Sequence, residues 1–207
     1  MKTASPITLV QTTVKSAFNQ LARLLNFISR GKLHPNMVTM FSFLGHVPIV
    51  ILIATDHHIS AGLLLIVFGL MDTLDGALAR LQNRASNKGM FLDSVTDRIK
   101  EVMLYIGIAY FFVSFLDPKL AVWAVAACGI SVAVSYLNAW GEVVTANLPK
   151  LHVKNSAFRN GLMSYDVRMF CLVVGLLFGV LEQAVIVIAV LSCITVLQRF
   201  NNVYKRL

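Results

Sequence analysis

Charged side chains are scarce in this sequence. Asp, Glu, Lys and Arg make up only 14% of the 207 residues, and 57% of the residues are hydrophobic. A soluble domain carries about a quarter charged residues, so the deficit points to lipid as the solvent. The composition also excludes a disordered or collagen-like chain. Because the apolar residues are spread along the whole length, we expect a polytopic membrane protein with a single domain, 1–207.

Cysteine is also rare. The three cysteines are far apart, and each lies inside an apolar stretch: Cys128, Cys171 and Cys193. Cysteine metal sites and disulfide frameworks need characteristic close spacings, which are absent here. We therefore expect these side chains to be small hydrophobic residues of the core.

Six apolar stretches are long enough to cross a bilayer. A hydrocarbon core about 30 Å thick needs about 20 residues of helix. The stretches that fit are roughly 37–55, 59–81, 90–115, 119–147, 162–181 and 183–200. We therefore expect an all-α fold in which residues 34–207 form a bundle of six transmembrane helices.

The first 33 residues have a different pattern. Apolar side chains recur at helical spacing, with Lys15 and Arg23 between them: Ile7, Val10, Val14, Phe18, Leu21, Leu24 and Leu25. This pattern predicts an N-terminal amphipathic helix within 1–33 that lies in the membrane interface. A helix packed against a soluble partner is the alternative.

Positive residues lie almost entirely on one side of this arrangement. With six spans, both termini share a side with the loops at 82–89 and 148–161. The cations on that side are Lys2, Lys15, Arg23, Arg30, Lys32, Arg84, Lys88, Lys150, Lys154, Arg159, Lys205 and Arg206, whereas the opposite loops hold Asp56, Asp117, Lys119 and Glu182. Because Lys and Arg stay cytoplasmic, we expect a protein integral to the cytoplasmic membrane with both termini cytoplasmic. The net charge of +8 then faces anionic lipid headgroups, and no feature indicates nucleic acid binding.

Four aspartates interrupt the second and third predicted spans. A charge at the centre of a membrane helix costs about 2.5 to 3.5 kcal/mol, so a purely structural role for four of them is not expected. Asp72 and Asp75 share one helix face, as do Asp93 and Asp97, and both pairs lie about 6 to 12 Å from the cytoplasmic ends of their helices. In an antiparallel helix pair, Asp75 would face Asp93 and Asp72 would face Asp97. Carboxylate oxygens suit hard cations, so we expect a site for two Mg²⁺ or Mn²⁺ ions with the active site toward the cytoplasm.

Small and basic residues follow the first aspartate pair. Gly76 and Ala79 remove bulk from the helix face that carries Asp72 and Asp75, and Arg80 adds a bidentate phosphate donor. Small residues also serve helix packing in membranes, which is the alternative for Gly76 alone. The combination favours a phosphorylated ligand.

The segment from Asp72 to Asp97 reads D-x2-D-G-x2-A-R-x8-G-x3-D-x3-D. It resembles the signature of the CDP-alcohol phosphatidyltransferases at every fixed position: Asp72, Asp75, Gly76, Ala79, Arg80, Gly89, Asp93 and Asp97. Residues 34–39, His-Pro-Asn-Met-Val-Thr, also look like that family's Pro-Asn-x-x-Thr segment before the first span. In layout the chain is most similar to the members that use inositol phosphate.

The resemblance implies transfer of a phosphatidyl group from a CDP-linked lipid to the hydroxyl of a small polar alcohol, with release of CMP. The implied ligands of the two metal ions are Asp72, Asp75, Asp93 and Asp97. Of these, Asp97 would also be the catalytic general base. The implied CDP-binding residues are Asp72, Gly76, Ala79 and Arg80. Homodimers are common in families of this kind, although no span here carries a strong self-association motif.

The signature does not identify the acceptor alcohol. Members that use inositol phosphate carry several arginines in two later segments, and the matching acceptor-binding positions here are Asn138, Trp140, Tyr165 and Arg168. Only Arg168 is an arginine, whereas an acceptor phosphate normally needs two or more cations. Lys154 and Arg159 could compensate from the loop, although headgroup contact is the alternative. The acceptor stays open between inositol phosphate, glycerol 3-phosphate and another alcohol.

Two other kinds of membrane protein also carry buried acids. Intramembrane prenyltransferases bind diphosphates through aspartates on two helices, but they look like longer chains and lack the glycine, alanine and arginine pattern. Ion or proton transporters use buried carboxylates as ion sites, distributed through the bilayer or placed on broken helices. The clustering of the four aspartates on one side favours the transferase.

Overall fold

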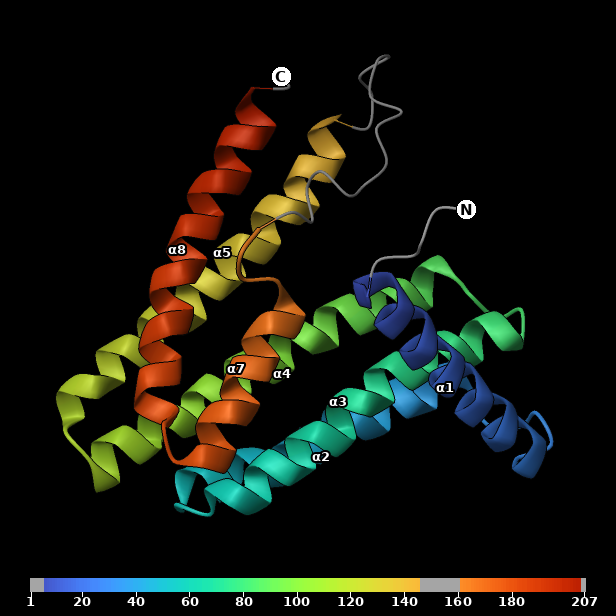
Figure 1. Cartoon of the computed structure of the whole chain (residues 1–207), viewed down its shortest axis with the longest axis horizontal. Helices are drawn as coiled ribbons and strands as arrows, with labels where there is room; N and C mark the ends of the chain where they lie inside the picture. Colours follow the sequence, from blue (N-terminus) through green and yellow to red (C-terminus); the bar gives the residue numbers. More distant parts are fainter. Residues whose placement is uncertain (1–5, 146–160, 206–207) are drawn as a thin grey trace. The chain divides into compact units, whose positions relative to one another are not determined.

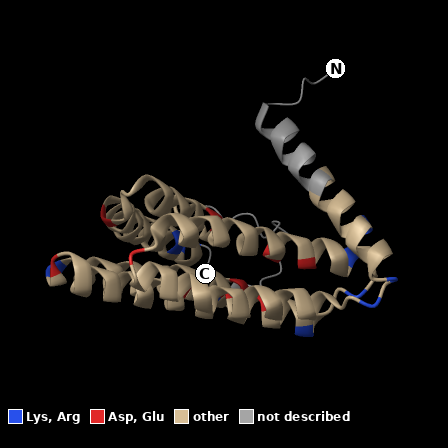
Figure 2. Cartoon of the chain, turned by 90° about the horizontal axis from the view of Figure 1, so that it is seen from below, with Lys and Arg blue, Asp and Glu red and all other residues tan. Residues whose placement is uncertain are grey.

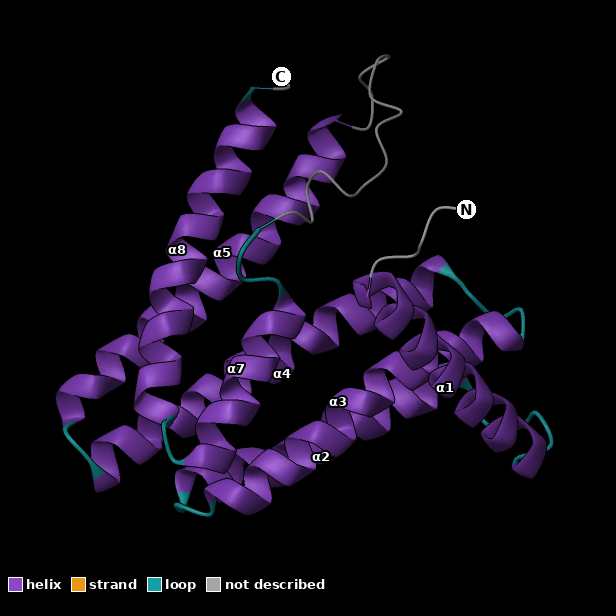
Figure 3. Ribbon diagram, in the orientation of Figure 1, coloured by secondary structure: helices purple, strands orange, loops and turns teal. Residues whose placement is uncertain are grey.

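The computed structural model describes residues 6–145 and 161–205, and these form helices and connecting loops with no strand among them (Figure 3). In chain order the helices are α1 (Pro6–Ile28), α2 (Pro35–Ala54), α3 (His58–Leu81), α4 (Asn87–Phe115), the 3₁₀ helix η1 (Pro118–Leu120), α5 (Ala121–Thr145), α7 (Tyr165–Phe178) and α8 (Leu181–Tyr204) (Figure 1). The predicted all-α fold is confirmed for this part of the chain.

Four segments of the described chain are long and apolar enough to cross a membrane: Pro35–Ala54, His58–Leu81, Pro118–Val144 and Leu181–Tyr204. The predicted spans at 90–115 and 162–181 do not meet this standard. α7 has only 14 residues, which extend about 21 Å of a core about 30 Å thick. α4 has 29 residues, but its first half is charged, and Figure 2 shows acidic and basic positions interrupting otherwise uncharged helices. The prediction of six spans is therefore supported at four positions.

Internal contacts group the chain into two compact units, divided within α2, α3 and α4. Unit 1 comprises Met1–Val47 and Leu65–Lys100, and unit 2 comprises Pro48–Leu64 and Glu101–Leu207. Each unit has its own buried side chains, described below. The single domain over 1–207 stays a prediction.

In unit 1, α1 packs against α3. Buried Ala22 and partly buried Leu25 contact Leu74 and Ala77, so one side of the N-terminal helix covers the α3 segment that carries the first aspartate pair. Other apolar side chains of α1 remain exposed: Leu21, Leu24, Phe27 and Ile28. A helix therefore forms where it was predicted, and its location in the membrane interface stays a prediction.

Close packing also joins α2 to α3 in unit 1. A Cβ atom at Gly45 would overlap the ring of Phe68, so only glycine permits this approach of the two helices. The Ser42 hydroxyl donates a hydrogen bond to the Phe68 carbonyl oxygen at 3.1 Å. These contacts hold the first half of α2 against α3.

In unit 2, α8 packs along α5, and α7 packs against α8 (Figure 1). Gly179 ends α7 in the left-handed conformation, with φ of 68°, and its N–H donates to the Gly175 carbonyl oxygen. Glycine adopts this conformation without the steric penalty of a Cβ atom. The resulting short turn lets α8 begin at Leu181 and return along α7.

The cysteines differ in part from expectation. Cys128 and Cys171 are partly buried, but Cys193 on α8 is exposed. Core burial was therefore the wrong prediction for Cys193. Exposure to hydrocarbon costs a small apolar side chain little, since lipid tails are as apolar as a protein core.

Candidate active site

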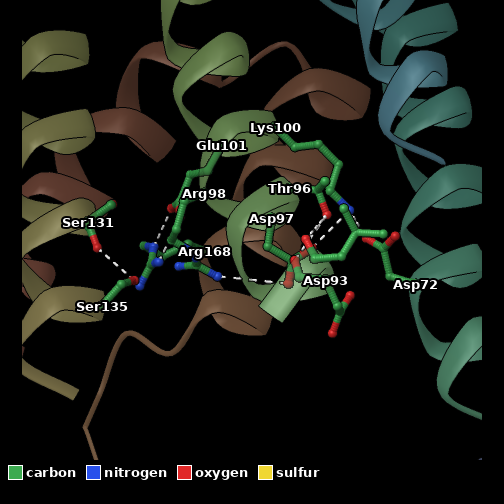
Figure 4. Close-up of polar contacts among 11 residues, drawn as sticks. Asp72, Asp93, Thr96, Asp97, Arg98, Lys100, Glu101, Ser131, Ser135 and Arg168 are labelled. Carbon is green, nitrogen blue, oxygen red and sulfur yellow. Dashed lines mark hydrogen bonds and ion pairs between the residues drawn. The ribbon is translucent and has the colours of Figure 1, made fainter. Parts of the chain in front are cut away.

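The predicted aspartates lie on two helices of unit 1. Asp72 and Asp75 are on α3, and Asp93 and Asp97 are on α4. The ammonium group of Lys100 lies 2.6 Å from Asp72 Oδ2 and 2.9 Å from Asp97 Oδ1 (Figure 4). Asp72 and Asp97 therefore both contact one cation, the ammonium of Lys100.

Sequence reasoning missed Lys100. Its side chain is fully buried, and it lies three residues after Asp97, on the same face of α4. A buried ammonium group needs partners of opposite charge, so a lysine one turn from a buried aspartate is the signal that could have found it. Its second partner, Asp72, lies 28 positions away in the sequence, and helical spacing cannot reveal such a contact.

Thr39 belongs to the Pro-Asn-x-x-Thr segment, and in the structure its side chain contacts Asp75. Its hydroxyl donates to Asp75 Oδ2 at 2.5 Å, and both side chains are buried. The Pro-Asn-x-x-Thr segment at the start of α2 thus fixes the orientation of one predicted metal ligand.

A pocket of about 220 Å³ opens between these elements of unit 1. The residues that line it come mostly from the signature and from the start of α2: Pro35, Asn36, Thr39, Asp75, Gly76, Ala79, Arg80, Arg84, Ala85, Ser86, Gly89, Met90 and Asp93. The structure therefore brings Asp75 and Asp93 to one pocket. Three of the four residues predicted to bind CDP also line it: Gly76, Ala79 and Arg80.

Gly76 has a specific place in this pocket. A Cβ atom there would meet only the Arg80 side chain, at 3.5 Å, and nothing from a neighbouring helix. Helix packing, the alternative considered for this glycine, therefore does not account for it. Its missing side chain leaves open space beside the arginine.

The carboxylates have the chemistry of a divalent cation site. All four are hard oxygen donors, and Asp72 Oδ1 is buried with no hydrogen-bond partner within the described residues. However, no three or more His, Cys, Asp or Glu side chains in the described ranges converge as a ready-made metal site. The donors suit Mg²⁺ or Mn²⁺, and in this arrangement Asp72 and Asp97 contact Lys100 while Asp75 accepts a hydrogen bond from Thr39.

The predicted acceptor residues lie in unit 2. Asn138 and Trp140 are on α5, and Tyr165 and Arg168 are on α7. Trp140 is half exposed and stacks on Tyr136, with ring centroids 6.4 Å apart. Asn138 Oδ1 is buried without a hydrogen-bond partner in the part of the chain described. Lys154 and Arg159 lie outside the described residues.

Arg168 is the most strongly held of these side chains. Its Nε donates to Glu101 Oε1 at 2.6 Å and its Nη2 to Oε2 at 2.9 Å (Figure 4). Its Nη1 donates to the Met163 carbonyl oxygen at 2.9 Å. Both members of the pair are almost completely buried. The guanidinium group thus binds a carboxylate of its own chain in the bidentate way in which it would bind a phosphate.

Comparison with known proteins connects this arrangement to a family. The family model described as CDP-alcohol phosphatidyltransferase matches residues 32–198. The chain belongs to the CDP-alcohol phosphatidyltransferase family. This phosphatidyltransferase is therefore a metal-dependent membrane transferase of phospholipid synthesis, which confirms the resemblance seen in the signature.

Known proteins of similar sequence or structure align with most of this chain. The archaetidylinositol phosphate synthase of Pyrococcus horikoshii is 30% identical over 180 residues, 84% of this chain and 85% of its own. A crystal structure of Mycobacterium tuberculosis phosphatidylinositol phosphate synthase with CDP-DAG bound has a TM-score of 0.76 and 24% identity, covering 90% of this chain and 93% of its own. A second, in complex with manganese and citrate, has a TM-score of 0.77 and 23% identity, covering 90% and 88%. These structures show that the fold is shared.

Proposed function

We propose that this chain, acting as a single catalytic domain, transfers a phosphatidyl group from CDP-diacylglycerol or a similar CDP-linked lipid to the hydroxyl of a small polar alcohol, releasing CMP. The observation that carries the proposal is the pocket of unit 1, where Asp75 and Asp93 share one space with Gly76, Ala79 and Arg80. The Mycobacterium tuberculosis relative with CDP-DAG bound supports the choice of donor.

The proposed metal site consists of the four aspartates of α3 and α4. Asp72, Asp75, Asp93 and Asp97 would hold two Mg²⁺ or Mn²⁺ ions, and the manganese complex of a relative with the same fold supports this choice of metal. When bound, such ions neutralise a diphosphate and stabilise the departing CMP. Thr39 orients Asp75 for this role through its hydrogen bond.

Side chains of the pocket would bind the donor. The Arg80 guanidinium can donate two parallel hydrogen bonds to one phosphate of CDP, and Gly76 leaves room for the nucleotide next to it. The small side chain of Ala79 leaves further room on the same helix face. Asp72 would be the fourth CDP-binding residue. A phosphorylated headgroup held here lies beside the aspartates.

Asp97 would be the general base. Its carboxylate takes the proton from the acceptor hydroxyl, the acceptor oxygen bonds to the lipid-side phosphorus, and the bond from that phosphorus to the CMP oxygen breaks. A positioned base of this kind contributes about 10² to 10⁴ in rate. Asp97 lies on α4, with its Oδ1 atom 2.9 Å from the Lys100 ammonium.

The acceptor we favour needs few cationic contacts. Asn138, Trp140 and Tyr165 provide no cation, and Arg168 is bound to Glu101. Glycerol 3-phosphate, which is smaller and needs fewer contacts, or an unphosphorylated alcohol suits these four residues better than inositol phosphate does. The second candidate is inositol phosphate itself, which is favoured by the similarity to an archaetidylinositol phosphate synthase.

The topology is part of the proposal. The one-sided distribution of Lys and Arg supports a topology with both termini and the aspartate site on the cytoplasmic side of the cytoplasmic membrane, with α1 in the interface. A homodimer is part of the proposal, and light scattering in detergent would measure the mass of the assembly.

The experiment that tests the proposal measures CMP. Purified protein is incubated with CDP-diacylglycerol, Mg²⁺ and one alcohol at a time, and the lipid product is identified by its mass. Alcohol-dependent release of CMP, absent in the matched Asp93→Asn variant, is the expected result. If no alcohol of the panel increases CMP release above that of Asp93→Asn, the proposed function is wrong.

A further inference from the structure

We propose that Lys100 is an internal counter-cation of the aspartate cluster, against which a divalent metal ion must compete. The inference deepens the proposed function and rests on it, because the competing ion is the proposed metal. It assigns Lys100 a positioning role: the lysine holds the carboxylates together and tunes their affinity for metal.

The geometry of Lys100 carries this inference. Its side chain has no exposed surface, and its ammonium lies 2.6 Å from Asp72 Oδ2 and 2.9 Å from Asp97 Oδ1. Asp72 belongs to α3 and Asp97 to α4, so the cation connects the two helices whose aspartates form the predicted site. Both distances are those of charge-assisted hydrogen bonds.

The electrostatics give the direction of the effect. Like charges on the carboxylates of unit 1 repel one another, and the ammonium of Lys100, in contact with Asp72 and Asp97, opposes that repulsion. A divalent ion that binds Asp72 or Asp97 must share oxygens with the ammonium or displace it, and it meets a like charge a few ångströms away. Removal of the lysine charge should therefore tighten metal binding by roughly 10-fold or more.

Two other positive side chains, Arg98 and Lys119, differ from Lys100. Arg98 Nη2 lies 3.9 Å from Asp97 Oδ2, and its side chain is partly exposed, so solvent screens it. Lys119 on η1 is outside unit 1 and exposed. A Lys119→Met variant therefore makes the same change in net charge outside unit 1 and serves as the matched control.

The test measures Mn²⁺ binding directly and needs no turnover. Free Mn²⁺ is titrated by electron paramagnetic resonance against purified wild-type protein, Lys100→Met, Lys100→Gln, Lys100→Arg and Lys119→Met. In parallel, the thermal midpoint is recorded with and without Mn²⁺. The glutamine variant retains hydrogen-bond donors without the charge, and it replaces the methionine variant as the deciding one if the latter does not accumulate.

The expected result separates charge from shape. Both neutral variants bind Mn²⁺ roughly 10-fold or more tightly and gain a larger metal-dependent rise in the thermal midpoint, because the metal now provides the positive charge that the lysine supplied. Lys100→Arg and Lys119→Met stay close to wild type. Equal or weaker binding by the neutral variants overturns the inference and leaves the metal site standing, whereas failure of the wild-type protein to bind Mn²⁺ overturns both.

Discussion

Replacement of Arg168 by methionine is expected to destabilise the protein strongly. In unit 2 the guanidinium makes two hydrogen bonds to Glu101, at 2.6 and 2.9 Å, and a third to the Met163 carbonyl oxygen. Methionine fills similar space but leaves the Glu101 carboxylate buried without this partner. Removing one member of a buried ion pair costs about 3 to 5 kcal/mol.

This free energy translates into a measurable shift. In a chain of about 200 residues, 1 kcal/mol moves the thermal midpoint by roughly 2 to 4 °C, so Arg168→Met should unfold roughly 6 to 20 °C below the wild-type protein. The midpoint is read from tryptophan fluorescence in detergent.

A second substitution tests the reason for the loss. Glu101→Gln combined with Arg168→Met removes both charges, so the double variant should recover part of the stability that Arg168→Met loses. A midpoint for Arg168→Met within about 2 °C of wild type, or a double variant as unstable as the sum of the two single variants, would refute the reasoning.

Three further predictions concern the site and the topology. Alanine at any one of the four aspartates should lower turnover at least about 10²-fold, and substantial CMP release in excess chelator would exclude the metal. Gly76→Leu should raise the KM for the CDP-lipid with little change in the thermal midpoint, because a side chain there enters the pocket and meets only Arg80; a large loss of stability would return Gly76 to a packing role. In a cysteine-free background, cysteines at His57 and Asp117 should react with an impermeant reagent outside intact cells, and a cysteine at Lys154 should not. Labelling of position 154 from outside would invert the topology.

The aspartate cluster could be predicted because its information is local. Three- and four-residue spacings place side chains on one helix face, and matched distances from the helix ends place the pairs at one depth. The contacts that sequence did not reveal join residues far apart in the chain. Thr39 reaches Asp75 across 36 positions and Arg168 reaches Glu101 across 67, and no periodic pattern encodes such partners.

The membrane spans were predicted from the hydropathy of the sequence, and the structure supports only some of them. Four predicted spans coincide with helices that are long and apolar enough to cross a membrane, α2, α3, α5 and α8, because each contains a long stretch with few charged residues. α4, whose first half carries Asp93, Asp97 and other charged residues, and α7, which ends at Gly179 after 14 residues, do not meet this standard, and their spans stay predictions. Charged residues in α4 and the turn at Gly179 after α7 both shorten an apolar stretch. The mean hydropathy of a segment does not reveal either feature.

The pairing of Arg168 with Glu101 bears finally on the acceptor. A guanidinium that already binds a carboxylate adds little net charge to a pocket, and Asn138, Trp140 and Tyr165 add none. Each lost charge-assisted phosphate bond is worth about 1.5 to 3 kcal/mol, so two or three of them equal the whole binding free energy of a millimolar ligand, about 4 kcal/mol. In a competition assay with inositol phosphate, glycerol 3-phosphate, inositol, serine and choline at equal concentration, inositol phosphate should therefore not be used fastest. If it is, and Arg168→Ala abolishes its use without lowering the thermal midpoint, then Arg168 serves the acceptor and not Glu101, and other residues must complete the phosphate site.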